Sequence, residues 1–329
     1  MAQNNNGGYK AEEAVRAFFL QIGYFPVRNI KFRFNSEEVT DLDLWAYGVG
    51  SPTHRSRVIV DCKYKIKHAQ VFERILWVEG LRRAVGVEHA VVATTDRRKA
   101  ASAFASRLQI RIIGSTMLDK LIAQNAQNER FSDEEFLNAV IPQEDKLVGR
   151  FKERIDASKS RLLRLDFDSV NLHIEDLLYY AQESTRLQDR TMVIRLFYLS
   201  LAFLLITLDF VLRDAVFLDE QSLRERIDEG IRFGSRGRAN AFILFNVLGK
   251  KKKIELIRAV ERVRADVLAD FFCRFAREDW FLQTALAFEE AAYHKSFIPV
   301  GQLSASAQSV VGILLDFLQV DRHTIFGVT

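Results

Sequence analysis

The sequence predicts an α/β domain followed by an all-α domain. Three observations support this division. The chain of 329 residues is longer than one hydrophobic core usually holds. Residues 1–124 alternate helical and strand periodicity, whereas residues 144–329 carry helical patterns alone. Residues 125–143 begin with a polar stretch without periodicity and are expected to form a linker between the two domains.

The elements of the first domain follow from periodicity and turn residues. Apolar residues recur at helical spacing from Tyr9 to Ile22, and Gly23 is expected to end this helix. Glycines and a proline at 48–52 predict a hairpin between the second and third strands. The other expected elements are strands Val27–Phe34, Val39–Tyr47 and Arg57–Tyr64, helix Val71–Val85, strand His89–Thr95, helix Arg97–Arg107, strand Gln109–Ile113 and a helix from Ser115, with Ser115 as N-cap. This order predicts a mixed sheet flanked by helices.

The second domain is expected to be helical throughout. Its predicted helices are Glu144–Arg164, Leu172–Gln188, Met192–Phe217, Ile254–Arg277 and Ser304–Leu318. The most apolar run, Leu196–Leu208, is shorter than the ~18 residues that suggest a membrane span. We therefore expect a buried helix of a soluble bundle and no membrane partner.

Composition narrows the class of protein. Hydrophobic and charged residues make up 48% and 27% of the chain, which is typical of a globular protein with a sizeable interior. Two cysteines, Cys62 and Cys273, are too few for a disulfide framework, which favours a reducing cytoplasm. The start of the chain has no apolar core or cleavage pattern, so no signal peptide is expected.

Charged residues interrupt the strand Arg57–Lys65, which reads RVIVDCKYK. Because side chains alternate, Asp61 and Lys63 share one face and Cys62 points to the other. If this strand pairs with VTDLDLWAY, Asp43 approaches both charged residues, since cross-strand Cβ atoms lie about 5 Å apart. Two close carboxylates need a cation, and hard oxygen ligands suit Mg²⁺ or Mn²⁺. Lys63 would orient the attacking water or stabilise charge on a phosphate.

The first helix adds a third acid. Glu12 lies nearly on the face of Val15 and Phe19, which is directed at the sheet, so it is expected to be functional or paired. Glu13 lies about 100° round the helix and is expected to meet solvent.

Four stretches in order resemble the Mrr-type restriction endonuclease branch of the PD-(D/E)XK nuclease superfamily. They are GYKAEEAVRAFFLQIGY, TDLDLWAYG, VIVDCKYK and AVVATTDRRKAASAFASRLQIRIIGSTMLDKLI, and they cover about the first 122 residues. The motif's aspartate falls on Asp43 and its (D/E)xK element on Asp61–Lys63. Two departures stand out: Thr40 replaces the motif's proline, which keeps Asp41 as a weaker candidate for the role of Asp43, and Asp61 stands where this branch often has glutamine or glutamate.

The resemblance implies a mixed sheet with flanking helices and DNA cleavage with a divalent metal. It implies that Glu12, Asp43, Asp61 and the backbone carbonyl of Cys62 hold Mg²⁺ or Mn²⁺, while Lys63 positions the water. We expect a homodimer that acts in restriction or defence against foreign DNA. The helical domain would serve recognition, dimerisation or a regulatory protein partner. The alternatives are a nuclease for RNA or branched DNA, and a non-catalytic binding protein that retains the fold.

Basic residues mark candidate contacts to nucleic acid. The segment Arg224–Arg264 has twelve Lys or Arg against five Asp or Glu. Such clusters bind phosphates, although many are simply solvated surfaces. The candidates are Arg236, Arg238, Lys250, Lys251, Lys252 and Lys253, together with Lys65 and Lys67 after the third strand.

Overall fold

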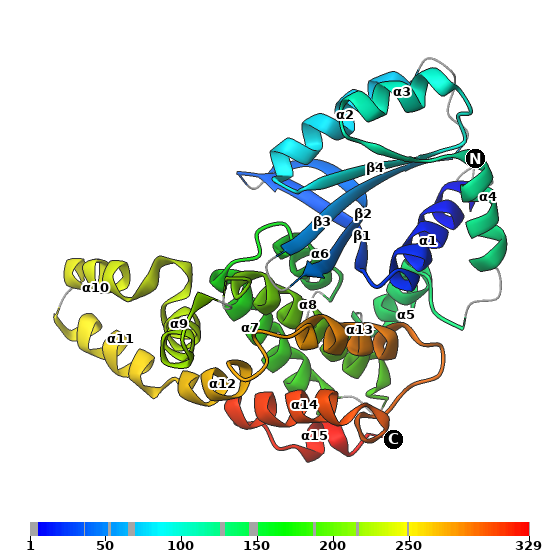
Figure 1. Cartoon of the computed structure of the whole chain (residues 1–329). Coiled ribbons are helices and arrows are strands. Elements are labelled where there is room, and N and C mark those ends of the chain that lie inside the picture. Colours follow the sequence, from blue (N-terminus) through cyan, green and yellow to red (C-terminus); the bar gives the residue numbers. More distant parts are fainter. Residues whose placement is uncertain are drawn as a thin grey trace. The chain divides into compact units, whose positions relative to one another are not determined.

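The computed structural model in Figure 1 describes most of the chain. It describes the backbone alone at residues 6, 140–144 and 250. The described residues are 6–35, 37–51, 54–64, 70–125, 129–144, 151–186, 189–214, 217–248 and 250–328. The chain divides into two compact units. Unit 1 comprises Met1–Asn138 and Ile155–Leu163, and unit 2 comprises Ala139–Arg154 and Arg164–Thr329.

Unit 1 contains a five-stranded mixed sheet in the order β1-β2-β3-β4-β5. The first three strands are antiparallel, and β3, β4 and β5 are parallel. The elements are α1 (Asn6–Gln21), β1 (Phe25–Phe34), β2 (Glu37–Ser51), β3 (His54–Lys63), α2 (Gln70–Val85), β4 (His89–Thr94), α3 (Lys99–Arg107), β5 (Arg111–Ile113) and α4 (Ser115–Gln124). The predicted mixed sheet with flanking helices is therefore confirmed, including the β2–β3 hairpin.

Helices cover both faces of this sheet (Figure 1). Helices α1 and α4 pack on the face formed by even-numbered residues of β2 and β3, where Ala11, Val15 and Leu118 join the core around Leu44 and Val60. Helix α2 covers the opposite face with its buried apolar residues. Charged side chains enter this otherwise apolar sheet at Arg28 of β1, Asp43 of β2 and Asp61 of β3.

The strands β2 and β3 separate at Asp43 and Asp61. Their pairing begins at Leu44 and Val60. On the N-terminal side of Leu44, β2 stays paired with β1. On the C-terminal side of Val60, β3 stays paired with β4 through Asp61 and Lys63. On β1, Asn29 has a left-handed backbone (φ 55°) and lies between Arg28 and Ile30, which pair with Leu44 and Leu42 on either side of Asp43. The fork leaves room for polar side chains between strands that are otherwise tightly paired.

The expected linker contains helix α5 (Asp133–Glu144). Asp133 is buried and accepts hydrogen bonds from Lys159 (2.8 Å) and Asn29 (2.9 Å). Lys159 comes from α6 (Phe151–Arg161), part of which returns to unit 1. Part of the polarity of this segment therefore reflects a buried ion pair, although Glu129 and Glu135 are exposed, and unit 1 extends beyond the predicted boundary at residue 124.

The start of α4 also differs from the prediction. Gly114, and not Ser115, is the N-cap, and it provides no side-chain cap. Ser115 is buried, and its hydroxyl accepts a hydrogen bond from Arg97 Nε at 3.0 Å. The serine therefore ties α4 to the loop between β4 and α3.

Unit 2 is helical, as predicted, but its helices are more numerous and shorter. Besides parts of α5 and α6 they are α7 (Phe167–Ser184), α8 (Thr191–Val211), α9 (Glu220–Phe233), α10 (Gly237–Val247), α11 (Lys250–Arg262), α12 (Ala265–Phe272), α13 (Trp280–Tyr293), α14 (Ala305–Phe317) and α15 (His323–Phe326). The single helix expected over Ile254–Arg277 is broken between α11 and α12, where Arg264 leaves the helical conformation.

Helix α8 contains the most apolar run of the sequence. Among the described residues it is the one helix long and apolar enough to cross a membrane, and 89% of its most apolar window is buried inside the protein. This burial matches the expected core helix of a bundle.

Candidate active site

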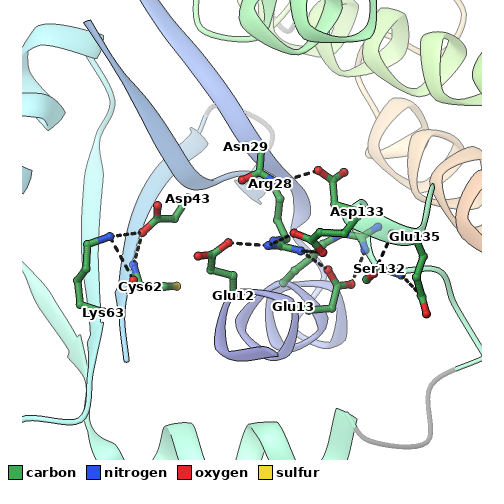
Figure 2. A network of polar contacts seen from close by, with 12 residues as sticks. Glu12, Glu13, Arg28, Asn29, Asp43, Cys62, Lys63, Ser132, Asp133 and Glu135 are labelled. Carbon is green, nitrogen blue, oxygen red and sulfur yellow. Dashed lines mark hydrogen bonds and ion pairs between the residues drawn. The ribbon is translucent and has the colours of Figure 1, made fainter. Parts of the chain in front are cut away.

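Three oxygen atoms surround the ammonium group of Lys63 at the end of β3. Lys63 Nζ lies 3.0 Å from Asp43 Oδ2, 3.3 Å from Asp61 Oδ1 and 3.3 Å from the carbonyl oxygen of Cys62. Figure 2 shows the side chains of Asp43 and Lys63 meeting beside Cys62. The structure thus brings together the strand residues that the sequence singled out.

Asp43 is fixed at the fork by the neighbouring strand. Its Oδ2 atom accepts a hydrogen bond of 2.7 Å from the backbone N–H of Cys62, which replaces a ladder bond where the strands part. Burial raises the pKa of Asp43, and the nearby charge of Asp61 raises it further, while Lys63 opposes the shift. An additional cation at this position would therefore stabilise the ionised form of Asp43.

Lys63 is held in its charged form. Burial alone would lower its pKa, but the carboxylates of Asp43 and Asp61 together raise it above the ordinary value. An ammonium group that stays charged donates hydrogen bonds and attracts anions, but it cannot act as a base at neutral pH.

Cys62 contributes through its backbone. Its side chain packs in the core between the sheet and α1, as predicted. Burial raises the pKa of the thiol far above its ordinary value, so the sulfur is a neutral, unreactive group. Its carbonyl oxygen is the group that faces Lys63.

Glu12 is paired with Arg28 of β1. The Nη2 atom of Arg28 lies 2.5 Å from Glu12 Oε2. In Figure 2 the Glu12 carboxylate lies between Arg28 and the group formed by Asp43 and Cys62. Burial raises the pKa of Glu12, Arg28 opposes this shift, and the charge of Asp43 adds to it. Glu12 is thus an electrostatic neighbour of Asp43, although it is not in contact with Lys63.

Glu13 does not meet solvent as expected. It is 9% exposed and accepts hydrogen bonds from Arg16 (2.6 Å) and Arg28 (2.9 Å). Arg28 also binds both oxygens of Glu134 on α5, at 2.8 and 2.9 Å. The side chain of Arg28 is fully buried, and this ionic network draws Glu13 inward.

Asp41 lines a small pocket together with Asp43 and Asp61, but it forms no ion pair with Lys63. It is exposed and pairs with Lys31 across the β1–β2 ladder, where its charged neighbours are Glu38, Lys31 and Asp156. Asp43 is therefore the better candidate of the two for a role at the fork.

The oxygens at the fork fit a hard divalent cation in their chemistry. Two carboxylates and one carbonyl converge on a single positively charged atom, Lys63 Nζ. Oxygen donors of these types are those that Mg²⁺ and Mn²⁺ prefer. In the described part of the chain, no group of three or more His, Cys, Asp or Glu side chains is arranged to hold a metal. Glu12 would have to join the cluster from its pair with Arg28.

The basic candidates occupy separate places. Lys65 and Lys67 lie outside the described residues. Arg236 and Arg238 are exposed at the start of α10. The lysine run forms the first turn of α11, where Lys251 and Lys252 are exposed. The side chain of Lys250 lies outside the described part of the structure. Lys253 is less exposed and donates a hydrogen bond to Asn246. Arg236 and Arg238 lie at the first turn of α10 and the lysines follow its last residue, Val247, so about 15 Å of helix separates the two groups and they do not form one compact patch.

Sequence reasoning did not identify Arg74 as part of the site. Arg74 lies on α2 and forms an ion pair with both oxygens of Asp61. Its position between Val71 and Ile75, two buried residues of α2, is the one signal that it lies near the sheet. Arg28 was also missed, although an arginine inside an apolar strand indicates buried acids nearby.

Comparison with protein-family models, curated proteins and solved structures found no match to this chain.

Proposed function

We propose that this protein is a metal-dependent DNA endonuclease whose unit 1 is a restriction-endonuclease-like domain of the Mrr type. The observation that supports it most is the convergence of Asp43, Asp61 and the Cys62 carbonyl on Lys63 at the fork of β2 and β3. The order of sequence motifs from Glu12 to Lys63 adds to this support.

In this proposal the acids and the lysine have separate tasks. Asp43, Asp61, the carbonyl of Cys62 and Glu12 would hold Mg²⁺ or Mn²⁺. Arg28 already engages Oε2 of Glu12, so Oε1 is the oxygen that would serve. A bound dication neutralises phosphate charge and lowers the pKa of water. Lys63, which stays protonated, would orient the attacking water and stabilise negative charge that develops on the phosphate.

The proposal extends to biological context. Cleavage of both strands of a duplex needs two active sites, so we propose a homodimer, with unit 2 serving recognition, dimerisation or a regulatory protein partner. A role in restriction or defence against foreign DNA, in the cytoplasm, accords with the resemblance of the sequence.

Purified protein should nick or linearise supercoiled plasmid with Mg²⁺ and should leave it intact with a chelator. Plasmid cleavage should be compared on methylated and unmethylated DNA, and against single-stranded DNA, branched DNA and RNA. Preferential cleavage of RNA or of branched DNA would change the substrate. If none of these nucleic acids is cleaved with any divalent ion, the proposed enzyme activity is contradicted and a non-catalytic binding protein is favoured.

Stabilisation by Mn²⁺ should grow as pH rises from about 5 to about 7. Because the pKa values of Asp43 and Glu12 are raised, the folded metal-free protein holds these protons more tightly than the unfolded chain does, and ionising them costs folding stability as pH rises. Mn²⁺ binds the ionised form and offsets that cost.

The increase in melting temperature on adding Mn²⁺ measures this effect at each pH. Asp43→Asn is the matched variant, because it cannot ionise at this position and should lose most of the pH dependence. An equal increase at both pH values in the parent protein would contradict the prediction.

A further inference from the structure

Arg74 is a second cation at the site. Its Nε atom lies 3.1 Å from Asp61 Oδ2, and its Nη2 atom contacts Asp61 Oδ1. The guanidinium group also stacks over the ring of Trp77, at 4.0 Å from its centre. The carboxylate is 5% exposed whereas the arginine side chain is 28% exposed. Arg74 therefore covers the outer side of an otherwise buried acid.

Both oxygens of Asp61 are already engaged by cations. Oδ2 accepts from Arg74, and Oδ1 contacts both Arg74 and Lys63. Oδ2 keeps a lone pair beside its hydrogen bond to Arg74, but a divalent ion bound there would lie next to the guanidinium charge, so the two cations compete electrostatically for Asp61. Bidentate, charge-assisted pairs of this kind are among the stronger polar contacts in proteins, which makes the competition significant.

Charge balance points the same way. Asp43, Asp61 and Glu12 carry three negative charges, although Glu12 shares Arg28 with Glu13 and Glu134, and Lys63 and Arg74 carry two positive charges. A dication added to this group leaves an excess of positive charge. The phosphates of a nucleic acid supply the missing negative charge, and the planar guanidinium group suits phosphate oxygens.

We propose that Arg74 is a built-in counterion of Asp61 that couples the binding of the divalent ion to the binding of the phosphate backbone. The inference rests on the proposed nuclease function and adds its regulation. Without nucleic acid, Arg74 occupies Asp61 and keeps metal affinity low. When the backbone binds, Arg74 exchanges the carboxylate for a phosphate, supported by the ring of Trp77, and Asp61 becomes available.

Calorimetric titration with Mn²⁺ in the absence of DNA tests the counterion role. Arg74→Gln should bind Mn²⁺ about 10- to 100-fold more tightly than the parent, because a charge-assisted bond to Asp61 is removed. Arg74→Lys keeps the charge but not the planar, two-pronged guanidinium group, and its Mn²⁺ affinity should fall between those of the parent and Arg74→Gln. Arg83→Gln on the same helix removes a charge that pairs with Glu79 instead, and it should match the parent.

The coupling is tested by repeating the titration with a hydrolysis-resistant phosphorothioate duplex. The duplex should strengthen Mn²⁺ binding to the parent by about 10-fold or more and to Arg74→Gln by much less. If Arg74→Gln folds poorly, the comparison of the parent with Arg74→Lys gives the same order with a smaller difference.

The outcomes separate this inference from the proposed function. Suppose that the parent binds Mn²⁺ and cleaves DNA, but both Arg74 variants bind Mn²⁺ no more tightly than the parent does. This result would mean that Arg74 only positions Asp61. Absence of Mn²⁺ binding in the parent and every variant, with and without duplex, would overturn the metal site and the inference together.

Discussion

Replacing Lys63 with alanine is expected to lower the rate of DNA cleavage by about 10²- to 10⁴-fold. Lys63 Nζ is the cation at which Asp43 Oδ2, Asp61 Oδ1 and the Cys62 carbonyl meet, and it is held protonated beside the position proposed for the phosphate. Its removal takes away the group that orients water and stabilises charge. Plasmid cleavage under single-turnover conditions measures the loss.

The Lys63→Ala variant should retain Mn²⁺ binding, because the oxygens of Asp43 and Asp61 remain and one competing cation is gone. Lys120→Ala, an exposed lysine on α4, is the matched control and should cleave at the parent rate. Cleavage by Lys63→Ala at the parent rate would refute the assignment of this lysine and weaken the whole active-site proposal.

Replacing Arg28 with methionine is expected to destabilise unit 1 by about 3–5 kcal/mol. Arg28 is fully buried and contacts the carboxylates of Glu12, Glu13 and Glu134. Burial alone would lower its pKa, but the hydrogen bond to Glu134 and the charges of Glu13 and Glu134 raise it, so the guanidinium stays charged. Without it, buried acids lose their counterion. Urea unfolding measures the change in the free energy of unfolding.

Tryptophan fluorescence can report on unit 1 selectively. The chain has three tryptophans, so in a Trp280→Phe background the signal arises from Trp45 and Trp77 of unit 1. Arg33→Met on the same strand is the matched control: Arg33 forms an exposed ion pair with Glu38, and its loss should cost less than about 1 kcal/mol.

A rescue experiment separates the charge of Arg28 from its packing. Adding Glu12→Gln and Glu134→Gln to Arg28→Met, while Glu13 stays as the counterion of Arg16, should recover a large part of the lost stability, because two unpaired charges are removed. No recovery would indicate that Arg28 stabilises unit 1 through packing and not through its charge.

The α/β half of the chain could be predicted because its signals are local. Apolar residues of β3 and β4 alternate or run continuously, and turn residues separate the strands, so periodicity alone indicates the order of elements. The segment after residue 124 could not be predicted in this way. Asp133 and Glu134 resemble solvated residues until their partners are known, and Lys159 and Arg28 lie far from them in sequence.

The candidate site shows the same division between local and distant information. Asp61 and Lys63 share a face through strand alternation, and hairpin pairing brings Asp43 to them, so the sequence was sufficient for this group. Arg74 and Arg28 could not be assigned, because their roles depend on which acids meet them in three dimensions. The exposure of Glu13 was wrong for that reason: its partner on β1 overrides its angular position on α1.

The chain leaves unit 1 after Asn138, returns at Ile155 and leaves again after Leu163. A chain truncated after residue 138 would therefore lack part of the sheet unit, because Lys159 and Ser160, which bind Asp133 and the carbonyl of Lys31, belong to the later segment. An isolated sheet unit must extend to Leu163 to keep these contacts.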